Sequence, residues 1–456
     1  MADEDNNIPQ TPVKPQLHLT HYITKISAST IPLHPTDSPR SPLSPSQSTL
    51  FIINNQDLLT EILLFLPPKS LLRFQCVSKL WLSIISNPNF RRLHSLRNRT
   101  SSAAATALFL YRVFIWVPEF SFICINNKPR DFHSMRVITA NLSNLREGFP
   151  WRIHSCNGLM CLDPYDNENT EFVIYNPTTH QQRLIPLPDS AENRHSMRDL
   201  NLAFDPLKPD YYKIVCVWMM LPEIILRFSV YSSDTGVWKE TDQYYEFEYE
   251  WDDEIGVEEN LSASSQDLGI LFKYGIYLNG AMHWASEVGD FLCFDLYNDR
   301  FKPMPSPLIP SDRWRRKIKY FGESDGHLHL VQTYGPRATL FDILEMENDY
   351  SNWTVKYRVD LDLLIARYPL IVNEEYDPAE VKRYRFRIPS FIVDEKEKKV
   401  KLVISVPGKV ISYDIINKKV VEHMEINPPD ALFFGENITL YDWIDAHKHL
   451  ETLACV

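Results

Sequence analysis

Residues 54–90 read NNQDLLTEILLFLPPKSLLRFQCVSKLWLSIISNPNF, and this stretch decides how the N-terminal part of the chain folds. In its first part, apolar residues recur at the i, i+3, i+4, i+7 spacing of one helix face, at Leu59, Ile62, Leu63 and Leu66. Further apolar residues lie off this face, at Leu58, Leu64 and Phe65. Because a helix that is apolar on several sides needs more than one neighbour, this small unit carries more apolar surface than it can bury alone.

Boundary signals divide the same stretch into three short helices. The Pro67-Pro68 pair is expected to end the first helix, because proline lacks an amide hydrogen and disfavours helical backbone in the preceding residue. Ser70 is a candidate N-cap for the second helix, and Ser78 is a candidate N-cap for its continuation. The Asn87-Pro88 pair repeats the signal, with a capping residue followed by a first-turn proline.

The residue order over this stretch resembles the F-box, in particular the plant form that is followed by an F-box-associated domain. The matching positions are Asp57, Leu58, Leu59, Glu61, Ile62, Leu63, Leu66, Pro67, Lys69, Ser70, Leu71, Arg73, Phe74, Val77, Ser78, Lys79, Trp81, Ile85, Pro88 and Phe90. The motif is specific, because many residue types agree in a fixed order. It departs from the family at its start, where Asn54 and Asn55 replace the usual Leu-Pro.

The resemblance implies that part of this apolar surface docks on a Skp-type adaptor, which links the chain to a cullin scaffold in an SCF ubiquitin ligase. The residues that it assigns to adaptor binding are Leu58, Leu59, Ile62, Leu66, Pro67, Leu71, Arg73, Val77, Lys79 and Trp81. The alternative is that Leu66, Leu71 and Trp81 form only the core of a small helical domain. Seven basic residues oppose two acidic ones between Phe51 and Thr100, in a chain of net charge −12. This basic island suits an acidic partner, although a solvated helix face explains it equally well.

Length and composition indicate a globular protein of two or three domains. The 456 residues are 44% hydrophobic and 12% aromatic, and no apolar run is as long as a membrane span. The first residues lack the features of a signal peptide, and the seven cysteines are scattered along the chain. We therefore expect a protein of the cytoplasm, the nucleus or both, with reduced thiols and no membrane partner. Its acidic balance argues against general binding of nucleic acid.

Composition also marks the domain boundaries. Residues 1–50 contain eight prolines and a Ser-rich run, and such a segment cannot bury enough apolar area to offset the entropy lost on ordering. We predict a disordered tail there. A second interpretation adds that the Ser-Pro pairs of this tail are phosphorylated by kinases. Residues 51–97 hold the F-box, and residues 98–107 have the composition of a linker.

From residue 108 to residue 456, short β-branched and aromatic runs alternate with turn signals. Five segments share a strand that ends in an aromatic residue, then a small polar residue, a turn and a second strand; the aromatic residues are Tyr175, Tyr231, Phe294, Phe341 and Tyr413. In three segments a large apolar residue follows seven positions later, at Trp238, Phe301 and Val420. An upstream turn recurs at Asn157-Gly158, Asn279-Gly280 and Asp325-Gly326.

Two hairpins per unit make a four-stranded blade, so this degenerate repeat predicts a β-propeller. The expected fold class is an α+β multidomain chain in which a small helical F-box precedes an all-β propeller of about six blades, with seven as the alternative. Its first blade would span residues 108–142, and strands near residues 438–453 would close the ring. A pair of β-sandwiches is the competing architecture. The motifs SCNGLMCL, YNPTT and HLETL resemble the plant F-box-associated domain.

A search for chemistry finds no nucleophile elbow and no phosphate loop, and only 13 glycines occur in the chain. His154, Cys156 and Cys161 come near metal-ligand spacing, but they surround a strand turn, where buried structural roles are more frequent. His327 and His329 alternate with Leu328 and Leu330 along a predicted strand. The two histidines therefore lie on the same face of the strand and are interpreted as structural. We expect no catalytic residue, no metal and no cofactor.

The acidic stretch QYYEFEYEWDDEIGVEE, residues 243–259, is the outlier of this region. Aromatic and acidic residues alternate in it, and the candidate substrate-binding residues are Tyr245, Glu246, Glu248, Glu250 and Trp251. An edge strand whose charges discourage aggregation is the alternative. The function implied by the whole chain is a non-catalytic adaptor that presents an unknown protein substrate for ubiquitination. The alternative function is a propeller enzyme or a carbohydrate-binding lectin in which the helical segment serves localisation.

Overall fold

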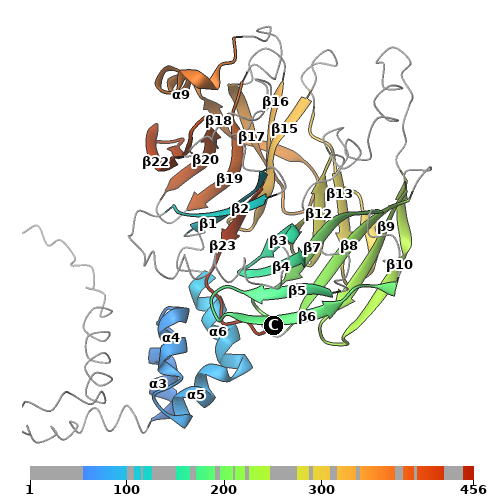
Figure 1. Cartoon of the computed structure of the whole chain (residues 1–456), viewed down its shortest axis with the longest axis vertical. Helices are drawn as coiled ribbons and strands as arrows, with labels where there is room; N and C mark the ends of the chain where they lie inside the picture. The colour runs from blue at the N-terminus through green and yellow to red at the C-terminus, as the bar shows by residue number, and fades with distance from the viewer. Residues whose placement is uncertain are drawn as a thin grey trace, which may run out of the picture. The chain divides into compact units, whose positions relative to one another are not determined.

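A computed structural model describes most of the chain from Asn55 onward (Figure 1). The described residues are 55–99, 107–114, 117–125, 150–164, 171–189, 196–208, 211–220, 225–246, 275–286, 291–308, 316–334, 339–374, 384–394, 398–425 and 445–456. They form two compact units. The described residues up to Ser86, apart from Pro67–Lys69, make the first unit, and Pro67–Lys69 with the residues from Asn87 onward make the second.

Four helices occupy the F-box stretch, rather than the three that were predicted. They are α3 (Gln56–Leu63), α4 (Pro68–Phe74), α5 (Lys79–Ser86) and α6 (Pro88–Arg99). Two of the predicted N-caps are confirmed: the amide of Trp81 donates to Ser78 Oγ at 3.2 Å, and the amide of Asn89 donates to Asn87 Oδ1 at 2.8 Å. The Asn87-Pro88 pair therefore starts a helix of its own.

The sequence prediction for Ser70 is wrong. Helix α4 already begins at Pro68, and Ser70 lies inside it. A proline is well placed at the first helical position, because the amide hydrogen that it lacks would have no partner within the helix. Helix α3 ends at Leu63, and the amides of Phe65 and Leu66 bond to the carbonyls of Ile62 and Leu63 in a tightening last turn.

The departure of this chain from the usual Leu-Pro opening has a structural role. Asn55 is the N-cap of α3, and its Oδ1 accepts hydrogen bonds from the amides of Asp57 and Leu58 at 3.1 Å each. Asparagine is among the preferred N-cap residues. The substitution thus stabilises the start of the helix that follows it.

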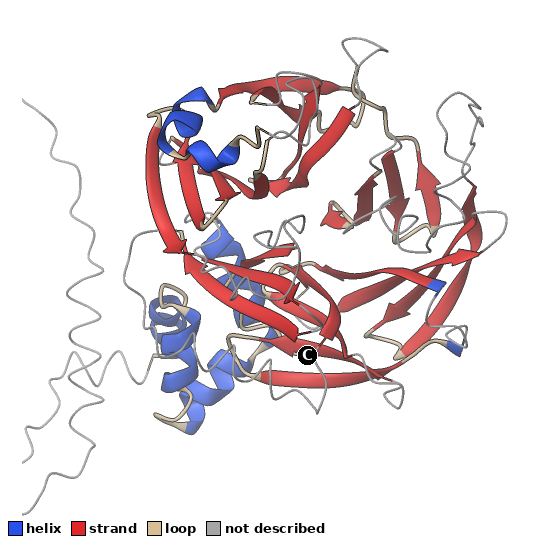
Figure 2. Cartoon of the chain, turned by 45° about the horizontal axis from the view of Figure 1, so that its top comes forward, coloured by secondary structure: helices blue, strands red, loops and turns tan. Residues whose placement is uncertain are grey.

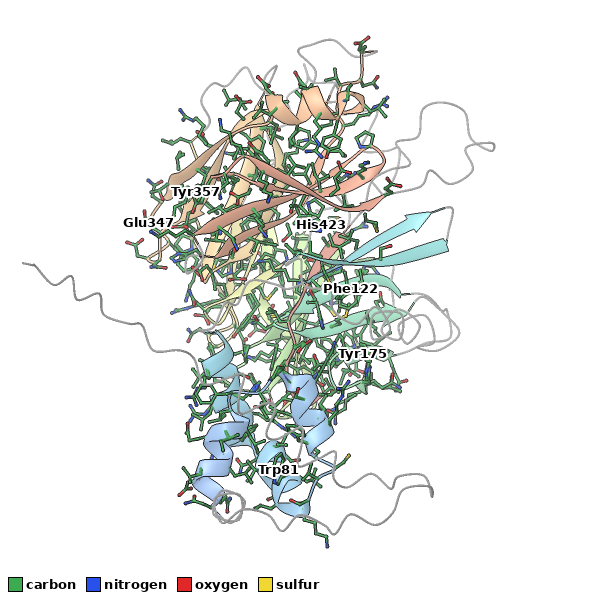
Figure 3. The ribbon with its side chains drawn as sticks, turned by 90° about the vertical axis from the view of Figure 1, so that its left-hand side faces the viewer. Trp81, Phe122, Tyr175, Glu347, Tyr357 and His423 are labelled. Atoms are coloured by element: carbon green, nitrogen blue, oxygen red, sulfur yellow. The ribbon has the colours of Figure 1, made fainter. Side chains whose placement is uncertain are left out.

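The helical unit has its own apolar core. Its buried side chains include Leu59 and Leu63 of α3, Leu71 of α4, and Trp81 of α5. The indole of Trp81, labelled in Figure 3, meets the ring of Phe74 edge to face, with 5.3 Å between the ring centroids. This arrangement is favourable for two aromatic rings.

The described residues of the second unit form six separate antiparallel sheets. The first sheet contains β3 (Pro150–Cys156), β4 (Leu159–Pro164), β5 (Glu171–Asn176) and β6 (Gln181–Pro186). The second contains β7 (Met197–Phe204), β8 (Tyr212–Met220), β9 (Ile225–Ser232) and β10 (Val237–Glu246). The third contains β11 (Ile276–Leu278), β12 (Ala281–Ala285), β13 (Phe291–Asp295) and β14 (Arg300–Lys302). In each of these sheets neighbours in sequence are neighbours in space, as expected for a propeller blade.

The fourth sheet contains β15 (Arg316–Ser324), β16 (His327–Tyr334), β17 (Leu340–Met346) and β18 (Trp353–Asp360). The fifth contains β19 (Arg387–Asp394), β20 (Lys399–Val406), β21 (Lys409–Asp414) and β22 (Lys419–Glu425). The sixth contains β1 (Ala107–Phe114), β2 (Val117–Cys124) and β23 (Asp445–His449). Two short helices, α9 (Asp362–Arg367) and η4 (Pro369–Ile371), connect the fourth sheet to the fifth.

The six sheets form a ring of blades, which Figure 2 shows around a central axis. The innermost strands pack against one another in the order β23, β3, β7, β11, β15 and β19, and β19 packs against β23 again. The β-propeller prediction and the count of six blades are confirmed. The alternatives of seven blades and of a pair of β-sandwiches are wrong, because the described strands make six blades in one ring.

The last blade joins the two ends of the propeller sequence. Strand β1 lies between β2 and β23 and pairs with both in antiparallel fashion; Leu108 is opposite Lys448 and also opposite Ile123. The predicted closure by C-terminal strands is therefore confirmed. Of the predicted first blade, residues 126–142 lie outside the described part of the chain, as do the predicted tail and most of the linker.

The repeated hairpin has the predicted register. The aromatic residue and the apolar residue seven positions later are direct cross-strand partners, in the pairs Tyr231 and Trp238, Phe294 and Phe301, and Tyr413 and Val420. Such pairs stabilise a sheet through side-chain contact. The prediction for Phe341 is wrong: it lies near the start of β17, opposite Val359, because this hairpin has longer strands.

The residues at the turns explain both recurring sequence patterns, the small polar residue of the outer hairpins and the upstream Asn-Gly pair. In the outer hairpins the small polar residue caps the turn; Asp295 Oδ1 accepts from the amides of Tyr297 and Asn298 at 2.8 and 3.1 Å. In the upstream turns both central residues have positive φ, 48° at Asn157 and 95° at Gly158. A two-residue hairpin of this kind requires such angles, and Asn-Gly provides them.

The side chain of Asn176, from the YNPTT motif, holds the C-terminal segment against the blade of β3 to β6. Its Nδ2 donates to the carbonyls of Ala454 at 2.8 Å and Thr452 at 3.3 Å, while its Oδ1 accepts from the amide of Thr178 at 2.8 Å. The side chain is fully buried. Its hydrogen bonds connect the motifs YNPTT and HLETL, which are distant in sequence.

Buried histidines add neutral polar contacts to the blades. His283 stacks on Tyr350 with 5.3 Å between ring centroids, and its Nδ1 lies 3.0 Å from the carbonyl oxygen of Ile276. Burial lowers the pKa of His283 to about 4. Burial likewise lowers the pKa of His329 to about 4, although Glu345 Oε2 lies 3.0 Å from its Nε2. Both imidazoles are therefore neutral at pH 7.

We predict that Asn176→Ala lowers the free energy of unfolding by about 3 kcal/mol, because it leaves several buried backbone groups without partners. Chemical unfolding followed by tryptophan fluorescence would measure the change. Asn417→Ala is the matched control, since Asn417 is exposed and its side-chain amide donates to Asp414 Oδ2 within a turn. Equal losses in the two variants would contradict this role of Asn176.

We also predict that stability falls as the pH is lowered from about 6.5 to about 4. The folded-state pKa of His283 is about 4 and thus below the ordinary unfolded value. Below about pH 6.5 the unfolded chain binds the proton first, so His283 favours unfolding by up to about 3 kcal/mol near pH 4, and its effect is constant above pH 6.5. Urea unfolding at several pH values measures this slope, which His283→Gln should reduce. An NMR titration of His283 with a midpoint near 6.5 would contradict the prediction.

Candidate functional site

The residues assigned to adaptor binding divide between the core and the surface of the F-box helices. Leu59, Leu66, Leu71 and Trp81 are buried. Ile62 is half-buried, and the remaining side chains are exposed, namely Leu58, Pro67, Arg73, Val77 and Lys79. The exposed members can contact a partner directly, whereas the buried members support the helices that carry them.

The structure adds exposed apolar residues that the sequence analysis did not assign to the site. The exposed fraction is 51% for Phe65, 37% for Leu80 and 46% for Leu82, compared with 40% for Leu58 and 46% for Val77. The position of Phe65 off the main apolar face of the first helix was the available signal. This small unit thus exposes several large apolar side chains, as interaction sites do.

The acidic candidate site lies only partly within the described chain. Tyr245 and Glu246 end β10, the outer strand of its blade, while Glu248, Glu250 and Trp251 lie outside the described residues. Tyr245 packs against the core between two blades, with its ring centroid 6.1 Å from that of Phe301. Glu246 is exposed. Tyr245 therefore has a structural role, and Glu246 is at the surface.

A cavity of about 300 Å³ lies at the centre of the propeller. Residues of β3, β11, β15, β19 and β23 line it, so the inner strands of several blades contribute. Its wall combines apolar and polar surface, with Ile276, Tyr277 and Phe321 among the apolar and aromatic lining residues. Its polar lining residues include Ser390 and the charged residues Lys319, Glu323 and Lys448.

His154 lines this cavity and connects its walls. Its ring nitrogen Nε2 lies 2.6 Å from the carbonyl oxygen of Gly275, and the amide of Leu202 donates to its Nδ1 at 2.9 Å. Because Nδ1 accepts, Nε2 must carry the proton. Burial lowers the pKa of His154, which keeps the imidazole neutral. Both nitrogens are thus engaged in structural hydrogen bonds.

The cysteines near His154 have the chemistry of buried apolar residues. Burial raises the pKa of the Cys156 thiol to about 12, and its Sγ accepts from the amide of Phe204 at 3.4 Å. Cys161 is also buried, and burial raises its pKa well above the ordinary value. A protonated thiol is a poor metal ligand. Among the described residues no group of His, Cys, Asp or Glu has the arrangement of a metal site.

Asp199 is a buried carboxylate with structural partners. Its Oδ2 accepts from the indole of Trp284 at 3.0 Å and from the amide of Gly275 at 3.3 Å. Its Oδ1 accepts from the amide of Leu200 at 2.9 Å. Burial raises the pKa of Asp199, and His154 opposes the effect together with the hydrogen bonds from Trp284 and Leu200. Asp199 therefore holds neighbouring inner strands together.

Comparison with known proteins identifies both parts of the chain. The family model of the F-box domain matches residues 55–93, and that of the F-box associated beta propeller domain matches residues 131–434. The chain is 28% identical over 412 residues to the Arabidopsis thaliana "F-box protein At5g07610", covering 84% of this chain and 90% of that protein. It is 25% identical over 258 residues to the Arabidopsis thaliana "F-box/kelch-repeat protein At3g23880", covering 55% of this chain and 65% of that one.

These matches agree with the geometry of both units. The F-box match spans α3 to α5 and the first half of α6, and the propeller match spans five complete blades. No helix in the described ranges is long and apolar enough to cross a membrane. On the match over most of its length, the chain belongs to the family of F-box proteins that carry an F-box-associated β-propeller domain.

Proposed function

We propose that this protein is the substrate-recognition subunit of an SCF-type ubiquitin ligase. The exposed apolar side chains of the F-box helices carry the proposal, because they have the composition of an interface and lie on the domain that docks in this family. The partner is a Skp-type adaptor, through which a cullin scaffold is reached. The propeller then binds the protein that is to be ubiquitinated.

In this proposal the chain contributes proximity rather than chemistry. A substrate held on the propeller meets the ubiquitin-conjugating enzyme at a raised effective concentration, which increases the rate without any catalytic group on this chain. The cytoplasm and the nucleus are the proposed compartments. Loops on a rigid scaffold determine which substrate is bound, since they vary without altering the blades.

The alternative function, a propeller enzyme or a lectin, would call for clustered carboxylates or stacked tryptophans at one end of the channel. Within the described lining of the central cavity, Glu323 is the single carboxylate and no tryptophan occurs. This lining gives the alternative no support.

We predict that the double variant Leu58→Ala and Val77→Ala weakens binding to a Skp-type adaptor at least tenfold. Both side chains are exposed, so the helices should keep their stability, and the loss should come from apolar contact with the partner. Isothermal titration calorimetry with the purified adaptor measures the affinity, and circular dichroism checks the helices.

The matched control is the double variant Val237→Ala and Ile416→Ala, which truncates two exposed apolar residues of the propeller. It should bind the adaptor as tightly as the wild type. Leu66→Ala and Trp81→Ala are unsuitable for this test, because both residues are buried and their truncation is expected to destabilise the F-box itself. Undiminished affinity of the Leu58 and Val77 variant would refute this docking surface.

For the acidic stretch we propose a role in capturing a basic substrate surface. Reversing the charge at Glu246, Glu248 and Glu250 with lysine should reduce the amount of captured substrate and leave adaptor affinity unchanged. Quantitative mass spectrometry of proteins crosslinked to the adaptor-bound chain measures capture. Neutral replacement with glutamine is the intermediate case. Identical capture by the wild type and the lysine variant would contradict the role.

A further inference from the structure

The central cavity contains a buried hydroxyl group with unused hydrogen-bonding capacity. Ser390 of β19 lines the cavity and is 1% exposed, and its Oγ has no hydrogen-bond partner among the described residues. Buried polar atoms in native proteins are rarely left without partners, so such an atom at a cavity wall calls for an explanation. A ligand that enters the cavity would provide the missing partner.

The same cavity contains an ammonium group that is only partly engaged. Lys448 of β23 donates to the carbonyl oxygen of Glu323, and the Glu323 carboxylate oxygen Oε2 lies 3.7 Å from its Nζ. An ammonium group has three donor hydrogens, so these contacts leave at least one for a ligand. The side chain is 26% exposed, and solvent can therefore reach it.

The turn after β15 holds the carboxylate of Glu323, so this carboxylate does not make a close ion pair with Lys448. Its Oε1 accepts from the amide of Gly326 at 2.8 Å, which fixes the carboxylate at the β15–β16 hairpin. Burial lowers the pKa of Lys448, but Tyr320 and Glu323 raise it by more, so the ammonium stays protonated at neutral pH. Lys448 thus lines the cavity with one carboxylate beside it, while Lys319, the other cation of the lining, donates to the carbonyl oxygen of Phe386 at 3.4 Å.

β-Bulges shape two of the walls. The pairing of β19 with β20 shifts between Arg387 and Ser390, and the pairing of β15 with β16 shifts between Ile318 and Tyr320. Bulges bend a strand and redirect its side chains, and they occur often beside functional sites. The walls that result combine apolar and aromatic side chains with polar ones.

We propose that the central cavity binds a monocarboxylate with an apolar body, whose carboxylate is held by Lys448 and Ser390. The two donors match the acceptor oxygens of a carboxylate. The apolar part of the wall matches the rest of the molecule, and about 300 Å³ is at the lower end of the range for small-molecule pockets. A dianion such as phosphate is disfavoured, because Glu323 would repel its second charge.

Two sources can supply this chemistry, a free organic acid or the C-terminal residue of a protein chain that ends in an apolar side chain. Both present a carboxylate next to an apolar group. The inference does not depend on adaptor docking, and its test uses the full-length chain without any adaptor.

The test is calorimetric titration at neutral pH with benzoate, and with an alanine tripeptide extended by a C-terminal phenylalanine. Benzamide and the C-terminal amide of the peptide are the neutral controls. We expect at least one acid to bind and its amide to bind at least tenfold more weakly. Binding of benzoate identifies free acids as ligands, and binding of the peptide alone identifies chain termini. Absence of binding by both acids up to about 10 mM, which would reveal even millimolar affinity, overturns the proposal.

Variants of the two donors assign the contacts. Ser390→Ala should weaken binding about five- to tenfold without loss of stability, because its hydroxyl has no partner to lose. Ser405→Ala is the matched control: Ser405 is 2% exposed and its Oγ also has no partner among the described residues, but it does not line the cavity. Equal losses of affinity in the two serine variants would overturn the assignment.

Variants of Lys448 and Glu323 should change the affinity for the ligand in opposite directions. Lys448→Met should weaken binding at least tenfold, whereas Glu323→Gln should strengthen it several-fold, because it removes the negative charge that competes for the ammonium. Lys448→Arg should retain part of the affinity. Thermal unfolding verifies that each variant is folded. If Lys448→Met and Glu323→Gln both weakened binding to the same degree, the pair would have only a structural role.

Discussion

The antiparallel pairing of β1 with β23 is the interaction on which the rest of the propeller depends. It joins strands from the two ends of the propeller sequence in one blade and so closes the ring of six. An open ring would leave the two terminal blades without a neighbour on one side, together with unpaired strand edges. Leu108 and Leu110 of β1 are fully buried, which shows that the closing blade is part of the core and not an appendage.

Closure also builds the central cavity. Strand β23 carries Lys448 to the carboxylate of Glu323 on β15, although the two residues are 125 positions apart in the chain. Neutral His154 links β3 to β7, and Asp199 binds Trp284 of the next blade. Most of these polar groups have partners, and their hydrogen bonds hold the inner strands. Ser390 differs from them, because this residue lines the cavity and its buried hydroxyl has no partner among the described residues.

The F-box helices use their residues in two ways. Leu59, Leu71 and Trp81 face the helical core, whereas Leu58 and Val77 are exposed. One short motif therefore combines residues that form the core of the domain with residues that are exposed to a partner. Asn55 illustrates a different point, since its departure from the usual residue adds an N-cap to α3. Its effect on docking would be exerted through the start of this helix.

The sequence alone determined the elements whose physics is local. Apolar periodicity and the caps at Ser78 and Asn87 predicted helices. The seven-residue spacing from Tyr231 to Trp238 predicted a cross-strand pair. Both kinds of prediction succeeded because they depend on residues that are close together in the sequence. The same reasoning failed at Ser70 and Phe341, where a first-turn proline and a longer hairpin moved the boundary.

Only the tertiary structure decided which residues of the F-box are exposed, that six blades close the ring, and which side chains meet in the cavity. The bonds from Asn176 to Ala454 and from Lys448 to Glu323 join segments more than a hundred residues apart. No local pattern specifies such pairs, because they form only when the closed ring brings distant strands within hydrogen-bonding distance.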